Sequence, residues 1–175
     1  MPGSCAQCGC SRGHHLYDCP TLQRAALEND DATIRRMTGE FAFLNSFHPA
    51  AVSFEGALYP SVEHAFHAAK TLDLAAREAL LTTSPAGAKR LGTRVALRPD
   101  WESVKLGVMA SLVRAKFSAP ELRARLVATA PRAIIEGNWW HDNFWGVCHC
   151  PTCGGRGLNH LGLILTEVRD EARGA

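Results

Sequence analysis

The sequence predicts an α+β fold that is predominantly helical: a single domain with a small zinc-organised segment at its N-terminus. Several stretches repeat apolar residues at three- and four-residue spacing after a capping Ser, Asp or Pro, as amphipathic helices do. Alternating apolar residues, the pattern of strands, occur only in short runs between turn signals. The cysteines gather in two clusters instead of being spread along the chain, which indicates metal ligands.

The composition is that of one soluble globular domain. The 175 residues are 46% hydrophobic and 21% charged, which is enough apolar material for a core. The net charge of +2 is too small to indicate a polyanion-binding surface, and it leaves anionic small molecules open as partners. No apolar run approaches the roughly 20 residues that span a bilayer, and MPGSCAQC lacks an apolar signal region. We therefore expect a cytoplasmic protein without a membrane partner, in which the cysteines are thiolates. The sequence indicates no oligomeric state.

Residues 1–37 are expected to form a segment of their own. Residues 1–20 have few aliphatic side chains and many Cys, Gly and His, so a metal ion would have to organise them. Residues 21–37 are expected to form a short helix with Leu22, Ala25 and Ala26 on one side. The main domain then spans 38–175.

The main domain is expected to be helical with a few strands. Residues 41–60 combine alternating apolar residues with turn signals and predict one or two short strands. After Pro131, the run AIIEG predicts an extended segment, and WWHDNFWG predicts a loop. Helices are expected after the caps Ser61, Ser84 and Asp100, after Pro120, and over residues 158–172.

Three ionisable residues of the segment YPSVEHAFHAAK fall on one strip of its predicted helix. Spacings of four and seven residues align Glu63, His67 and Lys70, while Val62 and Phe66 lie on the adjoining apolar face. Such a strip is ordinarily a solvated helix face, and ion pairs along it add little stability. Its position beside a buried face also fits the wall of a pocket, and features elsewhere in the chain decide between the two.

Aromatic residues supply two such features. Trp101 follows a predicted helix cap and therefore lies at the mouth of a helix N-terminus. The loop WWHDNFWG holds three Trp, one Phe and Asp142 within eight residues. A loop with so much aromatic area either closes the domain as a hydrophobic plug or binds a ligand. Flat rings beside a carboxylate suit a heterocycle joined to a sugar.

Eight blocks in a fixed order resemble the NADAR (YbiA-like) family. The resemblance runs from about Gly39 to about Arg169, roughly three quarters of the chain. One departure is visible, because the family reads Leu-Ser-Asn-Phe where this chain has Leu44-Asn45-Ser46-Phe47. The blocks are FLNSFHP, YPSVEHAFHAAK, SPAGAKRLG, LRPDW, VMASLVRAKF, IIEGN, DNFWG and GLNHLGLILTEVR.

The resemblance implies a YbiA-like fold and an N-glycosidase or ADP-ribosyl-glycosidase activity. The implied substrates carry a nucleobase-like nitrogen on C1 of a ribosyl 5′-phosphate or an ADP-ribose, such as riboflavin intermediates and guanine-linked ADP-ribose. ADP-ribosylated nucleic acid is a further substrate class. The family implies a lysine that forms a Schiff base with the opened ribose, and in EHAFHAAK that lysine is Lys70. No organic cofactor is expected.

The other site residues follow from this chemistry. Glu63 is expected to move a proton near Lys70, Asp142 to act as a second acid or base, and His67 to have no catalytic part. Trp101 and Trp145 would stack on the base or adenine. Lys116, with Lys89 and Arg98, would supply phosphate contacts, although Lys116 could equally be a surface side chain. The predicted substrate ligands are Asn45, Trp101, Lys116, Trp145, Gly146 and the backbone N–H groups of the helix that begins near Asn159.

The cysteine clusters predict a closed, structural zinc site with three ligand sets left open. The first is a knuckle of Cys5, Cys8, His14 and Cys19. The second joins the two clusters through Cys5, Cys8, Cys150 and Cys153. In the third, two separate zinc ions are bound, and Cys148, Cys150 and Cys153 share one of them with a fourth ligand from elsewhere. The expected consequence is indirect: zinc holds the loop with Asp142 and Trp145 in place.

Two other classes of function compete with the enzyme. One is a module that binds NAD or ADP-ribose without turnover. The other is a zinc-knuckle nucleic-acid adaptor, which is weakened because only Arg12 and Arg24 flank the N-terminal cluster.

Overall fold

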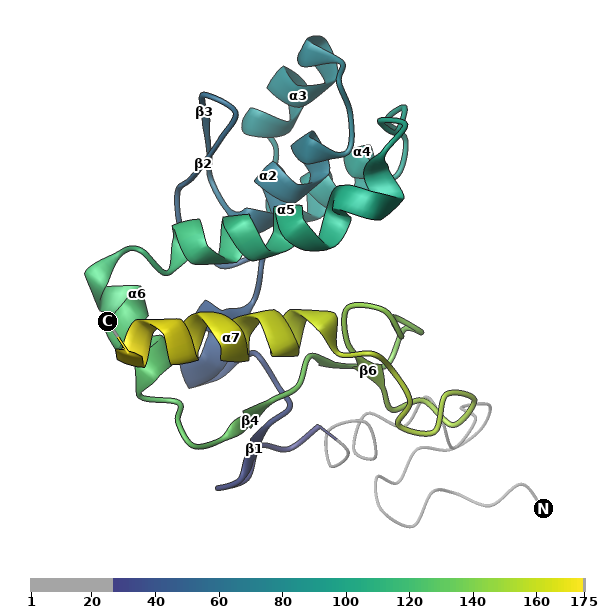
Figure 1. The fold of residues 1–175 in the computed structure, drawn as a ribbon. Helices are drawn as coiled ribbons and strands as arrows, with labels where there is room; N and C mark the ends of the chain where they lie inside the picture. Colours follow the sequence, from purple (N-terminus) through teal and green to yellow (C-terminus); the bar gives the residue numbers. More distant parts are fainter. Residues whose placement is uncertain (1–26, 175) are drawn as a thin grey trace, which may run out of the picture. The chain divides into compact units, whose positions relative to one another are not determined.

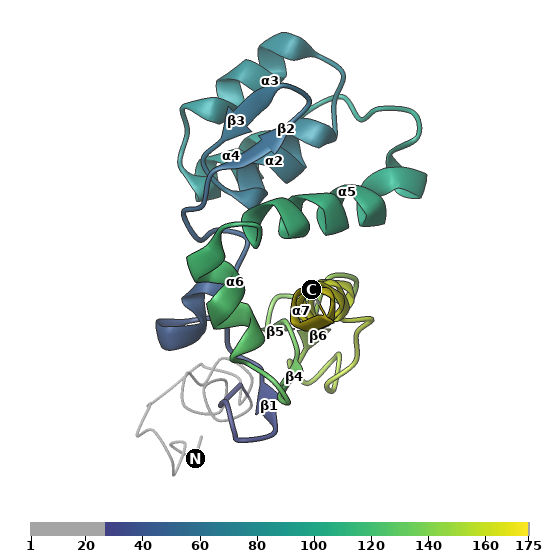
Figure 2. The ribbon, with the colours of Figure 1, turned by 60° about the vertical axis from the view of Figure 1, so that its left-hand side comes forward.

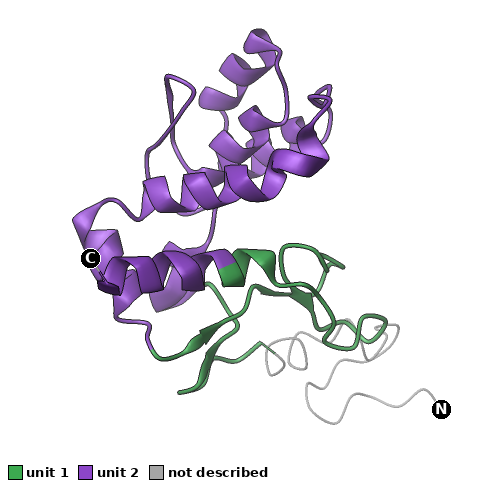
Figure 3. Ribbon diagram, viewed as in Figure 1, with its two compact units in different colours: residues 1–37, 131–163 green, residues 38–130, 164–175 purple. Residues whose placement is uncertain are grey.

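The computed structural model describes residues 27–174, and their helices and strands are drawn in Figure 1. The chain forms two compact units, coloured separately in Figure 3. Unit 1 holds residues 1–37 and 131–163, and unit 2 holds residues 38–130 and 164–175. The domain boundary expected at residue 37 stays a prediction, because the unit that holds residues 27–37 also takes in 131–163.

Unit 2 is built around one short buried helix, α2. Every residue of α2 is buried, and it packs against α3, α4, α5 and the hairpin of β2 and β3 (Figure 2). A helix surrounded in this way needs small side chains on several faces, which explains the alanines of VEHAFHAA. The elements of unit 2 are η2 (Gly39–Leu44), β2 (Val52–Phe54), β3 (Ala57–Tyr59), α2 (Val62–Ala69), α3 (Leu74–Leu81), α4 (Pro85–Gly92), α5 (Trp101–Lys116), α6 (Pro120–Val127) and most of α7 (His160–Gly174).

The helices begin where local sequence satisfies their first N–H groups. Ser84 Oγ accepts a hydrogen bond from the backbone N–H of Gly87 at 3.1 Å, and a proline opens both α4 and α6. Asp73 caps α3 through the N–H of Ala75 at 2.9 Å. Ser61 precedes α2 as expected, but its hydroxyl pairs with the His64 ring at 2.7 Å and does not cap the helix.

The strands β2 and β3 form a tight hairpin that packs on α2. Val52 is opposite Tyr59, and Phe54 is opposite Ala57, so Glu55 and Gly56 alone make the turn. Both have positive φ, at 45° and 82°, as a two-residue type I′ turn requires. The hairpin confirms the strands expected within residues 41–60, although the first part of that stretch is the 3-10 helix η2.

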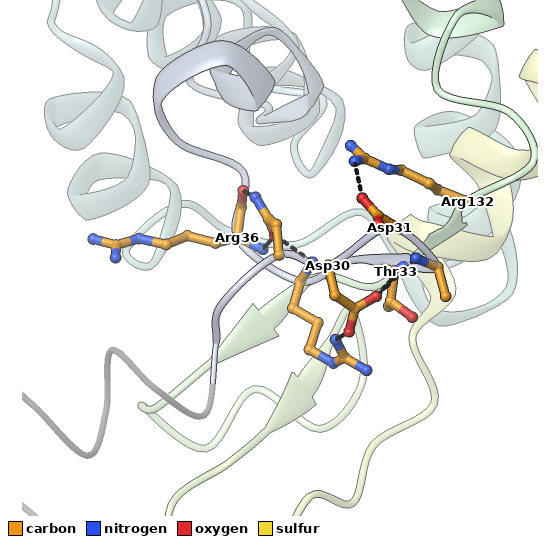
Figure 4. A network of polar contacts seen from close by, with 8 residues as sticks. Asp30, Asp31, Thr33, Arg36 and Arg132 are labelled. Carbon is orange, nitrogen blue, oxygen red and sulfur yellow. Dashed lines mark hydrogen bonds and ion pairs between the residues drawn. The ribbon is translucent and has the colours of Figure 1, made fainter.

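The described part of unit 1, residues 27–37 and 131–163, contains two short parallel strand pairs. β1 (Thr33–Ile34) pairs with β4 (Ala133–Ile134), and β5 (Gly137–Asn138) pairs with β6 (Val147–Cys148). The turn before β1 is held by Asp30 Oδ1, which accepts the N–H of Thr33 at 2.7 Å, and Asp31 pairs with Arg132 at 3.6 Å (Figure 4). The helix expected over residues 21–37 is wrong for the described part, because residues 27–37 form this turn and β1.

The α+β, predominantly helical fold class is confirmed. The helices expected after Ser61, Ser84, Asp100 and Pro120 and at the C-terminal end are all present. The zinc-organised segment expected within residues 1–20 lies outside the described residues. Within 27–174, no helix combines the length and the apolar character that crossing a membrane requires.

Candidate active site and metal centre

Two residues of the predicted ionisable strip, Glu63 and His67, are buried on α2, and Lys70, directly after α2, is partly buried, so the strip does not form a solvated face. Glu63 and His67 expose only 8% and 5% of their surface. His67 Nε2 donates a hydrogen bond to Glu63 Oε1 at 3.0 Å, one helical turn away. A buried carboxylate without a partner would be costly, so this bond is part of what keeps Glu63 inside unit 2.

His67 in turn is held by the close approach of α4. A Cβ atom built on Gly92 would lie 2.0 Å from His67 Nδ1, so only glycine leaves room for the ring. His67 was expected to have no catalytic part; the structure shows its hydrogen bond to Glu63, and the expectation stays a prediction. Its i, i+4 spacing from Glu63 was the available signal in the sequence.

Lys70 follows the last residue of α2 and extends over two aromatic rings. Its Nζ lies 5.5 Å from the centroid of the Phe66 ring and 5.9 Å from that of Trp101. The two rings are packed together, with centroids 5.1 Å apart. Burial lowers the pKa of Lys70 below its ordinary value; Glu63 opposes this shift by attraction, and Lys89 adds to it by repulsion. More of the amine is therefore neutral and nucleophilic than in a solvated lysine.

Lys116 and Asn45 meet at the other end of α5. Lys116 exposes only 2% of its surface and donates from Nζ to the Asn45 backbone carbonyl at 2.8 Å. Burial lowers its pKa to about 7. Trp101 and Lys116 are the first and last residues of α5, so about 22 Å of helix separates their Cα atoms. The alternative of a surface side chain for Lys116 is wrong, and the structure does not bring Lys116 together with Lys70 and Trp101.

Arg98 and Lys89 are the other two cations that were expected to bind phosphate. Each contacts another residue of unit 2. Arg98 forms a two-pronged ion pair with Asp100, with N–O distances of 2.6 and 3.0 Å. Lys89 Nζ lies 5.8 Å from the centroid of the Phe47 ring.

In unit 1, the aromatic loop is held together by buried Asn138. Asn138 Oδ1 accepts the N–H groups of Trp140 and Asp142, and its Nδ2 donates to the Asp142 carbonyl at 2.7 Å. One carboxylate oxygen of Asp142 accepts the N–H groups of Phe144 and Trp145 at 3.2 and 2.9 Å. Asp142 thus shapes the loop from within, which does not test its predicted acid–base role.

The aromatic loop, residues 139–146, is hydrogen-bonded to the residues that begin α7. The N–H groups of Asn159, His160 and Leu161 donate to the backbone carbonyls of Gly146, Phe144 and Trp145 at 3.0–3.3 Å. These N–H groups were expected to bind phosphate, and the structure shows them engaged within the protein. Gly146 lies so close to Glu136 that a Cβ would overlap its carbonyl oxygen, at 2.1 Å. Trp145 and His160 meet edge to face, with centroids 6.4 Å apart.

Three cysteines and one histidine of unit 1 form a cluster that could hold a metal ion. The ligand atoms of His141, Cys148, Cys150 and Cys153 all lie within 4.8 Å of one another. This arrangement matches the third of the predicted ligand sets and supplies the fourth ligand that the sequence left open. His141 was missed because a single histidine in an aromatic loop gives no spacing signal. Cys5, Cys8, His14 and Cys19 lie outside the described residues.

Comparison with known proteins identifies the family and the fold. The NADAR domain family matches residues 32–173. N-glycosidase YbiA of Escherichia coli (strain K12) is 38% identical over 136 residues, which cover 75% of this chain and 82% of that protein. YbiA of Shigella boydii is also 38% identical over the same share of both chains. The maize chloroplastic riboflavin biosynthesis protein PYRR is 37% identical over 133 residues, one fifth of its length.

The fold has a solved counterpart. The NMR structure of the Escherichia coli protein YbiA superimposes with a TM-score of 0.69 at 35% sequence identity, covering 86% of this chain and 90% of that one. These relationships define a glycosidase, an enzyme of the hydrolase class. The chain belongs to the NADAR family, as its sequence blocks predicted.

Proposed function

We propose that this enzyme hydrolyses the N-glycosidic bond between a nucleobase-like nitrogen and ribose C1 of an ADP-ribosyl or ribosyl-5′-phosphate substrate. Guanine-linked ADP-ribose, free or on nucleic acid, is the first substrate to test. Support for a ribosyl substrate comes from relatives named N-glycosidase YbiA and riboflavin biosynthesis protein. The alternative of a module that binds ADP-ribose without turnover makes the same contacts but needs no nucleophile.

The observation that carries the proposal is the setting of Lys70. Its amine has a lowered pKa, stands over the Phe66 and Trp101 rings, and feels the charge of Glu63. An amine of this kind can attack C1 while the C1–N bond to the base breaks, the departing base taking up a proton. The C1–O4′ bond then opens, O4′ takes a proton, and the nitrogen of Lys70 forms a Schiff base with C1. Water adds to C1, the amine leaves, and the sugar is released.

Glu63 is proposed to move the protons at the Lys70 end of this sequence. Its bond from His67 fixes one carboxylate oxygen and orients the group within unit 2. Asp142 is proposed to protonate the leaving base, on the strength of its place in the DNFWG block. Trp101 and Trp145 are proposed to stack on rings of the substrate.

The remaining predicted ligands are engaged with other parts of the protein. Asn45 and Lys116 are engaged with each other, so we propose that they shape the end of α2 and α5 and meet at most a part of the substrate distant from C1. Gly146 and Asn159 are proposed to position the loop on α7. We expect no organic cofactor, a structural part for any bound metal, and a cytoplasmic setting.

The test measures sugar release from guanine-linked ADP-ribose by the wild type, Lys70→Ala and the control Lys105→Ala. Lys105 is paired with Glu102 on α5. We expect release by the wild type and the control, none by Lys70→Ala, and a covalent adduct at Lys70 when borohydride is added. Substrate binding without release by the wild type would favour the binding module. Release without any adduct would leave the glycosidase but remove the lysine mechanism. If no release occurs, ribosyl 5′-phosphates of the riboflavin pathway are tested in the same three proteins.

A further inference from the structure

The three cysteines in the described part of unit 1, Cys148, Cys150 and Cys153, lie in a chain reversal that brings their sulfur atoms together. Cys148 is the last residue of β6, and the following turn contains Cys150 and Cys153. The turn closes because the N–H of Gly154 donates to the Cys150 carbonyl at 2.7 Å and that of Gly155 to the Cys148 carbonyl at 3.0 Å. Both glycines have positive φ, at 62° and 78°, a conformation that other residues rarely adopt. All three cysteines are buried, and Trp139 packs against them.

His141 completes this group from the aromatic loop. Its Nδ1 lies 3.3 Å from Cys153 Sγ and 3.4 Å from Cys150 Sγ. Tetrahedral coordination by zinc, with Zn–S near 2.3 Å and Zn–N near 2.0 Å, sets nitrogen and sulfur ligands about 3.5 Å apart. These two nitrogen–sulfur distances are therefore close to those of ligands on one ion. A two-iron cluster divides its ligands between two metal ions and would need a wider group.

The surroundings of the sulfur atoms are suited to thiolates. Each sulfur accepts one N–H group at 3.3 Å: Cys148 from the His141 backbone, Cys150 from the Cys153 backbone, and Cys153 from the Asn143 side chain. Neutral thiols are weak acceptors, whereas thiolates bound to a metal are ordinarily supported by such donors. Three thiolates this close would repel one another unless a cation lay between them.

The backbone conformation of His141 is an independent observation that favours a bound ion. Its φ is 67°, in the left-handed region, which is unfavourable for residues other than glycine. The side chain that this conformation presents to Cys150 and Cys153 belongs to a residue that is otherwise exposed. A metal bond to Nδ1 would offset the cost of that conformation.

We propose that His141, Cys148, Cys150 and Cys153 bind one zinc ion in a closed tetrahedral site. Zinc fits because thiolate and imidazole ligands in this number and geometry are those of structural zinc sites. The ion ties the aromatic loop to the turn after β6. Asp142, Asn143 and the residues up to Trp145 follow His141 directly, so the ion fixes the loop in which the Asp142 carboxylate and the Trp145 ring lie.

The first experiment counts zinc in the full chain. Zinc is measured by mass spectrometry of purified wild type, Cys148→Ser, His141→Asn, His141→Cys and the neighbouring control His149→Asn. We expect Cys148→Ser to hold one equivalent less than wild type, and His141→Asn to lose one equivalent to a chelator far faster. His141→Cys restores a fourth thiolate and should keep the ion, and His149→Asn should match the wild type. Unchanged zinc in both Cys148→Ser and His141→Asn would overturn the site.

A second experiment separates this site from one that includes the N-terminal cysteines. The double variant Cys5→Ser with Cys8→Ser is loaded with cobalt, whose absorption reports thiolate ligands. If the proposed site is right, the cobalt spectrum of the site remains in this variant and is lost in Cys150→Ser. Loss in both would show that Cys5 and Cys8 are ligands and would overturn the proposal. Amide hydrogen exchange reports the effect on the loop. Exchange in residues 138–157 should be faster in His141→Asn, which loses the ion, than in the wild type. In His141→Cys, which keeps the ion, it should be as slow as in the wild type.

Discussion

Lys70 and Lys116 both lie in unit 2 and both have lowered pKa values, but their surroundings suit them to different roles. Lys116 is almost fully buried and donates to a carbonyl of the protein itself. Lys70 is only partly buried, and aromatic rings rather than hydrogen-bond acceptors lie beside its amine. A nucleophilic amine must be accessible to the substrate and must not already be hydrogen-bonded to the protein. Lys70 therefore fits the role of nucleophile better than Lys116.

Changing Glu63 to Gln should move the pH dependence of the reaction. Because the Glu63 carboxylate attracts the ammonium of Lys70, its removal lowers the pKa of Lys70 further. In a plot of kcat/KM against pH, the activity should rise as Lys70 loses its proton. The midpoint of this rise should lie below pH 10.5 in the wild type and at a still lower pH in Glu63→Gln. The maximal rate should also fall, by about 10²–10⁴-fold if Glu63 transfers protons. An unmoved limb would mean that the titrating group is not Lys70.

Lys116 should make stability depend on pH. With a folded pKa of about 7, Lys116 is neutral in the folded protein above pH 7, whereas in the unfolded chain it stays protonated up to about pH 10.4. Unfolding then takes up a proton, so the free energy of unfolding rises with pH in this window, by up to about 1.4 kcal/mol per pH unit. Below pH 7 both states are protonated and this contribution is flat. Relative to Lys116→Met, the wild type should gain about 2 kcal/mol between pH 7 and 9.

Urea unfolding at pH 6, 7.5 and 9 measures this difference. Lys105→Met is the matched control, since Lys105 lies on the same helix and is paired with Glu102. Its difference from the wild type should stay constant with pH. Parallel curves for Lys116→Met would show that Lys116 is not neutral in the folded protein.

At the scale of elements, α2 depends on how closely α4 approaches it. Gly92 ends α4, and its missing side chain leaves the space that the His67 ring fills. The same contact keeps the His67 Nε2–H directed at Glu63. The packing of two helices therefore sets the orientation of a proposed catalytic carboxylate.

Gly92→Ala should destabilise the protein and weaken the site. The added methyl would overlap His67 Nδ1, and overpacking of this kind costs about 1–3 kcal/mol. We expect a lower Tm and a reduced kcat. The control Gly107→Ala places its methyl on α5 with no atom within 4 Å, and should stabilise by about 0.5–1 kcal/mol through helix propensity. Equal stability of the two variants would contradict the packing argument.

The elements that could be predicted were those with a local signal. Ser84 with Pro85, Pro120 and the alternation before Tyr59 marked their helices and strands correctly. α3 was missed because LAAREALL exposes much of its surface and has a weak apolar stripe, leaving only the Asp73 cap as a signal. η2 was missed because a single 3-10 turn has no characteristic spacing.

At the scale of the molecule, the sequence could predict which residues lie in one site for some residues but not for others. Glu63, Lys70 and Trp101 could be linked because helix periodicity and family blocks place them. The membership of His141 in the cysteine cluster depends on a left-handed turn that no periodicity encodes. The burial of Lys116 depends on long-range packing around the end of α5, so its sequence context left a phosphate ligand and a surface side chain equally open.

The charge of the whole molecule gives a prediction about nucleic-acid substrates. With a net charge of +2, the chain should neutralise few phosphates beyond those of the ADP-ribosyl group itself. The dependence of affinity on salt follows the number of phosphates neutralised, and two contacts correspond to about a tenfold loss between 50 and 200 mM. For ADP-ribosylated DNA, kcat/KM should therefore fall by about tenfold or less over this range. Guanine-linked ADP-ribose, measured in parallel, is the control and should show a similar dependence. A loss of about a thousandfold on DNA alone would instead indicate an extended phosphate-binding surface, such as the N-terminal cysteine segment would supply as a nucleic-acid adaptor.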